Sequence, residues 1–192
     1  LSGTPDGAET LTVVPSSSTA IYDATGNAAS TSQSNNTVSL NDQVAPIVSS
    51  VTSTKANGTY STGEVIPITI TFTEVVNVTG TPQLTLETGS SDAVVNYTSG
   101  SGSNTLTFNY TVAAGHTSSD LDYVATTSLA LNSGTIKDAA LNVATLTLAS
   151  PGATNSLGVN KALIINNAPV ANDQSLKTNK DTPLKIKLTG SD

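Results

Sequence analysis

Two segments of this chain alternate strictly between apolar and polar residues. In residues 66–73 the sequence reads Ile-Pro-Ile-Thr-Ile-Thr-Phe-Thr, and residues 105–112 read Thr-Leu-Thr-Phe-Asn-Tyr-Thr-Val. Successive side chains of a strand point to opposite faces, so this alternation predicts strands with one buried face and one solvated face. Such strands are typical of antiparallel sheets. No other feature of the chain constrains the fold as strongly.

Shorter apolar segments and turn sequences extend this pattern. Asn57-Gly58 and the Gly/Ser-rich residues 98–103 are typical turns. Residues 121–131 are apolar but irregular and predict a short strand or a bent connection. About seven to nine short strands separated by turns predict an all-β, two-sheet sandwich. The further predicted strands are residues 47–51, 83–86, 93–97, 143–148 and 163–165.

Composition agrees with β-structure and excludes several classes of protein. Ser, Thr and Asn are abundant and are mediocre helix formers. The net charge is −7 and every basic residue is Lys, so the guanidinium group that reads phosphates and base edges is absent and no nucleic-acid partner is expected. The chain has no Cys, which excludes disulfides and thiolate metal sites. No stretch is long and apolar enough to predict membrane insertion.

A short motif occurs twice. Asp23-Ala-Thr-Gly-Asn27 matches Asp138-Ala-Ala-Leu-Asn142, and an Ala-Pro pair follows each copy, at 45–46 and 168–169. Internal repeats predict tandem modules, here with a period of roughly 120 residues. We therefore expect the end of one module in residues 1–43, a complete module in 44–167 and the start of another in 168–192. The chain opens on Leu rather than Met, which fits an internal fragment.

The repeated motif also predicts local structure. Asp carboxylates often accept hydrogen bonds from backbone N–H groups a few residues on, so an Asx-type turn is favoured over metal binding at Asp23 and Asp138. Leu141 stands where the first copy has Gly26, so the second turn is expected to differ or to be strained.

Several motifs give the chain a family resemblance. The chain resembles tandem immunoglobulin-like and cadherin-like repeats of large secreted bacterial adhesins and cell-surface proteins. The resemblance implies an immunoglobulin-like, Greek-key β-sandwich with partial flanking modules. It also implies an extracellular, non-catalytic role as a stalk, spacer or fibre, neighbouring repeats of the same protein as partners, and calcium at module junctions. The motifs are residues 60–68, 72–76, 80–86, 119–123 and 134–138, and in the last segment 168–175, 181–184 and 188–192.

Carboxylates supply the candidate calcium ligands, since calcium takes about six to eight oxygen atoms. Asp120 and Asp122 would lie on one side of a locally extended segment and, with Glu64 and a junction residue, could form a cage. The other candidate acids are Asp42 in the first linker, Asp138 in the second motif copy, Glu74 and Asp23. The alternative is that these acids lie on loops and keep the surface polar.

No arrangement in the sequence predicts catalysis. His116 is the only histidine, no Gly-x-Ser-x-Gly motif is present, and we expect a solvent-exposed loop histidine. Two other functions remain open. The partial end segments could donate strands to other copies and build a filament. An accessory carbohydrate-binding module would instead require the five tyrosines to converge on one face: Tyr22, Tyr60, Tyr97, Tyr110 and Tyr123.

Overall fold

The fold is all-β, as predicted. A computed structural model describes residues 3–12, 22–27, 37–167, 170–171, 187 and 190–191. Most of the predicted third segment, 168–192, lies outside the described residues. The described part contains β1 (Thr10–Thr12), β2 (Thr37–Ser39), β3 (Val48–Ser53), β4 (Gly58–Tyr60), β5 (Val65–Thr79), β6 (Gln83–Leu86), β7 (Ala93–Ser99), β8 (Ser103–Thr111), β9 (Leu129–Ala130), β10 (Thr135–Lys137), α1 (Leu157–Asn160), β11 (Leu163–Ile165), β12 (Val170–Ala171) and β13 (Gly190–Ser191).

One curled antiparallel sheet contains seven of these strands. Its order is β10-β5-β8-β7-β6-β9, and β3 pairs with β5 beside this path. Two strands change partners along their length, which folds the sheet over the core. β5 pairs with β3 and β8 over its first half, with β8 again at Val76 and with β10 at its end, while β7 pairs first with β6 and then with β8.

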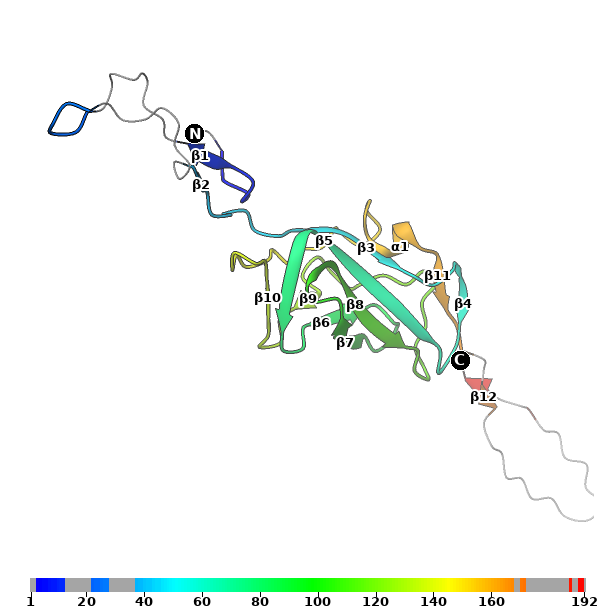
Figure 1. Cartoon of the computed structure of the whole chain (residues 1–192). Helices are drawn as coiled ribbons and strands as arrows, with labels where there is room; N and C mark the ends of the chain where they lie inside the picture. Colours follow the sequence, from blue (N-terminus) through cyan, green and yellow to red (C-terminus); the bar gives the residue numbers. More distant parts are fainter. Residues whose placement is uncertain are drawn as a thin grey trace, which may run out of the picture.

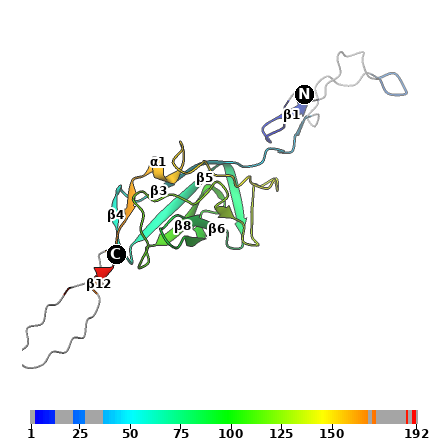
Figure 2. The same cartoon turned by 180° about the vertical axis from the view of Figure 1, so that it is seen from behind.

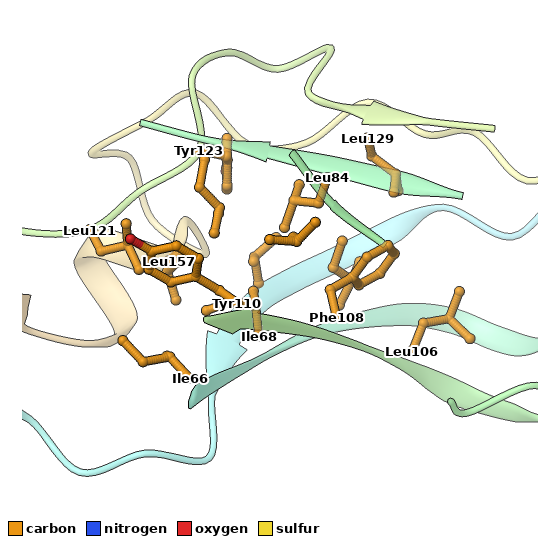
Figure 3. Packing of buried hydrophobic residues seen from close by; sticks show 14 of the residues in the cluster. Ile66, Ile68, Leu84, Leu106, Phe108, Tyr110, Leu121, Tyr123, Leu129 and Leu157 are labelled. Carbon is orange, nitrogen blue, oxygen red and sulfur yellow. The ribbon is translucent and has the colours of Figure 1, made fainter. Parts of the chain in front are cut away.

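The predicted alternation sets the buried face of the central strands. Ile66, Ile68 and Ile70 on β5 are 0% exposed, and Phe108 and Tyr110 on β8 are at most 1% exposed. Figure 3 shows the side chains of Ile66, Ile68, Phe108 and Tyr110 reaching the same interior as Leu84, Tyr123, Leu129 and Leu157 from facing elements. Burying an apolar side chain of this size contributes about 1.5–3 kcal/mol, so this interior supplies the main driving force for folding.

The strand predictions outside the centre are confirmed in part. β6 and β11 have the predicted bounds, and β7 covers the predicted 93–97. β3 begins one residue after the predicted start at Ile47, which forms only an isolated bridge. Residues 143–148 form isolated bridges instead of a strand: Thr145 pairs with Ile47 and Val143 pairs with Lys137. Residues 121–131 contain the irregular connection, which bridges Leu86 through Tyr123, and end in β9.

Short strand pairs lie on either side of the sandwich. Figures 1 and 2 show β1 and β2 beyond one end and β12 beyond the other. β1 pairs with β2, and β12 pairs with β13, both antiparallel. The last strand of the sandwich, β11, pairs in parallel with β4 near the exit of the chain. Among the described residues, no helix has the length and apolar character needed to cross a membrane.

Candidate functional site

The two copies of the repeated motif fold into the same loop and share four hydrogen bonds. In the second copy the Asn142 N–H donates to Asp138 Oδ1 and its amide Nδ2 donates to Oδ2, both at 2.8 Å. In the first copy Asn27 makes the same two bonds to Asp23 at 2.9 Å. Hydrogen bonds from Asn27 and from Thr25 hold the pKa of Asp23 well below its ordinary value. The predicted Asx-type turn is therefore present in both copies.

Leu141 adopts the backbone conformation of the glycine that it replaces. Its φ is 75°, against 87° for Gly26, and its N–H bonds the Asp138 carbonyl as the Gly26 N–H bonds Asp23. A left-handed conformation places a Cβ too close to the following carbonyl oxygen, so this leucine is strained. Of the two predicted outcomes, a different turn or a strained one, the structure has the strained one.

The second loop borders an acidic cluster at the N-terminal end of the sandwich. Ligand oxygens of Asp42, Glu74 and Asp138 all lie within 4.8 Å of one another. They come from the linker after β2, from β5 and from the loop after β10. Asp138 is only 4% exposed. Burial, with the negative charges of Asp42, Asp138 and Asp6 nearby, raises the pKa of Glu74 above its ordinary value.

An open groove of about 530 Å³ adjoins this cluster, between the N-terminal segment and the sandwich. Thr4 and Asp6 line it from the N-terminal segment, and Ile47 and Glu74 line it from the sandwich. The Gln43 N–H donates to the Pro5 carbonyl at 2.7 Å, which ties the N-terminal segment to the linker that enters the sandwich. The acidic groups therefore collect where one segment of the chain meets the next.

Asn142 connects the loop to the incoming linker. Besides its bond to Asp138, its Nδ2 atom lies 3.2 Å from the carbonyl oxygens of Asp42 and of Val44. Asp42 in turn accepts the Val44 N–H at 2.8 Å. One asparagine side chain thus fixes the linker against the loop.

Asn167 holds the outgoing linker at the opposite end. Its Oδ1 accepts the N–H of Thr62 at 2.8 Å and the hydroxyl of Thr62 at 2.7 Å. Its Nδ2 donates to the carbonyls of Ala113 at 3.1 Å and of His116 at 2.8 Å. The side chain therefore joins two loops of the sandwich to the residue where the chain leaves it.

The structure divides the predicted metal ligands into separate places. It brings the candidate acids Asp42, Glu74 and Asp138 together, a grouping that the sequence did not predict. Asp120 and Asp122 lie elsewhere, and both are next to Gly158. A Cβ added to this glycine would be 3.6 Å from the Oδ2 atom of Asp120 and 3.0 Å from that of Asp122.

Each of the remaining predicted ligands already caps backbone groups. Asp120 accepts the Leu163 N–H, and Asp122 accepts the N–H groups of Tyr123 and Gly152. Glu64 accepts the Ser61 N–H at 2.8 Å. Among the described residues, these three acids form no group of three or more ligand atoms as compact as the junction cluster.

His116 is not the free loop residue that the sequence suggested. It is half-buried, its Nδ1 lies 2.9 Å from the Tyr110 hydroxyl, and the two rings stack with centroids 5.8 Å apart. Burial raises the pKa of Tyr110 to about 12. Both groups therefore belong to the packing of the loop after β8.

Comparison with known proteins adds no assignment. No protein-family model, no curated protein and no solved structure matches the chain.

Proposed function

We propose that the chain is a non-catalytic spacer segment of a secreted bacterial surface protein, built from tandem immunoglobulin-like modules with Greek-key connections. Its partners are the neighbouring modules of the same protein. The observation that carries this proposal is the repeated loop: two segments 115 positions apart, at Asp23 and Asp138, share two bonds to the Asp carboxylate and two backbone bonds. Repeated local structure in one chain is the property of a modular array.

The fixed linkers support a mechanical role. Asn142 fastens the incoming linker and Asn167 fastens the outgoing one, each through several hydrogen bonds. A linker held by side chains at both ends of a module transmits orientation from one module to the next, whereas a Gly/Ser-rich linker would not. A stalk or spacer requires this property.

Calcium at the incoming junction is the second part of the proposal. Three carboxylates crowd one point, and a bound proton or a cation would reduce their mutual repulsion beyond what the hydrogen bonds to Asp42 and Asp138 already do. Calcium accepts carboxylate oxygens and completes its shell with carbonyls or water. Bound there, the ion would hold the linker residue Asp42 to Glu74 and Asp138 of the sandwich.

The two alternative functions have less support. For strand donation, the described strands of the end segments pair within the chain, β1 with β2 and β12 with β13. For carbohydrate binding, Tyr60, Tyr110 and Tyr123 are buried and Tyr97 is half-buried, which leaves Tyr22, at 51% exposed, as the one exposed tyrosine.

Distance measurements between spin labels test the rigid junction. The chain has no Cys, so Ser39→Cys on β2 and Asn104→Cys on β8 give one defined pair of labels. We expect a narrow distance distribution that Asn142→Ala broadens, because the linker loses its anchor. Asn109→Ala is the matched control, since it removes an exposed asparagine on β8 far from the linker. A broad distribution in the unaltered junction would refute the spacer role.

A further inference from the structure

The chain enters the sandwich at one end and leaves it at the other. Residues 45–53 lead in and residues 162–167 lead out, and Figure 1 shows β1 and β2 beyond the first end and β12 beyond the second. A spacer in an array is pulled through these two segments. The force therefore acts along β3, back toward the entrance, and along β11, forward toward the exit.

The entering strand lies alongside its partner over its whole pairing. β3 pairs with β5 at residues 50–53. Just ahead of β3, the Thr73 N–H donates to the Ile47 carbonyl at 2.9 Å, and the Thr145 N–H donates to the Pro46 carbonyl at 2.8 Å. Hydrogen bonds between antiparallel strands lie perpendicular to the strands. A pull along β3 therefore loads its bonds to β5 in shear and all together.

The leaving strand is held on both sides. β11 pairs in parallel with β4, where Leu163 lies opposite Gly58 and Ile165 lies opposite Tyr60. On its other side, the Ile165 N–H donates to the Ser118 carbonyl at 2.8 Å, and the Ser118 N–H donates to the Ile165 carbonyl at 2.9 Å. Leu163 and Ile165 are at most 2% exposed, so sliding of β11 would also drag two apolar side chains out of the core.

One short path connects the two held strands. β4 continues through the turn at residues 61–64 into β5, which is the partner of β3. Asn167 at the exit accepts two hydrogen bonds from Thr62 in this turn. The Val112 N–H donates to the Glu64 carbonyl at 2.9 Å, which holds the turn to the end of β8. Tension thus passes from β3 to β5, around the turn to β4 and out through β11, while β6, β7 and β9 lie beside this path.

We propose that the sandwich bears tension, with both terminal strands loaded in shear and with β4 and β5 joining them. This inference rests on the spacer role, since only a segment pulled from both ends carries such a force. It adds a direction to that role: the sandwich resists a pull between its two ends better than a pull that separates β3 from β5 sideways. Forced unfolding is governed by the barrier to unfolding and not by the equilibrium stability.

Single-molecule force spectroscopy with two pairs of handles tests the direction. The chain has no Cys, so handles can be attached through single cysteines at exposed residues. Asn41→Cys with Lys187→Cys pulls along both terminal strands. Asn41→Cys with Val75→Cys instead pulls β3 and β5 apart from the entrance, one residue pair at a time. The two pairs share the entrance handle, so the linker anchors ahead of β3 contribute equally, and chelator removes any contribution from calcium.

The lengthwise pull should require a force at least about three times that of the sideways pull, because three β4–β11 pairs break together in the first case and single pairs break in turn in the second. Equal forces for the two handle pairs would overturn the proposal.

A matched pair of variants tests the path of the force. Leu163 on β11 and Leu84 on β6 are both 0% exposed, and Leu163→Val and Leu84→Val each remove one methylene from the core. Both variants should lower the urea midpoint to a similar extent. Under the lengthwise pull, only Leu163→Val should lower the unfolding force, and equal losses in the two variants would overturn the path. Neither readout reports linker rigidity, so rigid linkers combined with equal forces would remove this proposal and leave the spacer proposal in place.

Discussion

Leu141→Gly tests whether the repeated loop stores strain. The left-handed conformation of Leu141, at φ 75°, costs about 1–2 kcal/mol for a residue with a Cβ. Glycine removes this cost, but it also gives the unfolded chain more conformational freedom. That freedom lowers the stability of the folded state by about 0.4–1 kcal/mol. Leu141→Ala separates strain from side-chain contacts, because alanine keeps the Cβ and loses the rest. We therefore expect the glycine variant to be more stable than the alanine variant by about 0.5–1 kcal/mol.

The comparison with the unaltered chain follows from the exposure of the side chain. Leu141 is 71% exposed, so truncation loses only a small part of the roughly 1.5–3 kcal/mol that full burial of a leucine provides. Urea unfolding monitored by circular dichroism measures all three proteins. A shift in midpoint at constant slope reports stability alone. If the alanine variant equals or exceeds the glycine variant in stability, the strain argument is wrong.

Two other predictions concern ionisation. Because its pKa is raised in the folded state, Glu74 stabilises the sandwich only at low pH, and this stability is lost as pH rises through the folded pKa. Glu74→Gln should therefore raise the melting temperature of calcium-free protein at neutral pH and abolish stabilisation by calcium; an unchanged calcium response in this variant would remove the metal proposal. Tyr110 and Tyr123 keep their protons to about pH 12, and burial is the main cause of both shifts. The unfolded state ionises first, near pH 10, so stability should fall between pH 10 and pH 12, by about 1–2 kcal/mol for each tyrosine after solvent screening. Spectrophotometric titration should show both tyrosines ionising only on unfolding, and early ionisation would contradict their burial.

The sequence predicted the central strands well because period-two alternation is itself the mark of a half-buried strand. Ile66 to Phe72 and Leu106 to Val112 are buried at the predicted positions. Residues 143–148 carry the same kind of pattern and form no strand. Alternation indicates which side chains are buried, whereas a strand also needs a neighbouring strand with which it pairs continuously. Here Ile47 and Lys137 each form only a single bridge to this segment.

The candidate site was predictable only where local chemistry determined it. The Asp138 and Asn142 loop follows from contacts within five residues, so its Asx-type bonds could be read from the motif. Glu74 joins it because the end of β5 pairs with β10, and such a pairing between distant segments leaves no local signal. Asp120 and Asp122 attracted attention by their spacing, but their oxygens cap backbone groups nearby.

The hydrogen bonds at Asn167, where the chain leaves the sandwich, restrict which side chain can occupy this position. Its oxygen accepts two hydrogen bonds while its nitrogen donates two to carbonyl groups. Only a carboxamide combines acceptor and donor in this way on so short a stem. Deamidation to aspartate would direct a negative charge at the Ala113 and His116 carbonyls. Slow chemical ageing of this one residue would therefore release the outgoing linker and let it rotate against the sandwich.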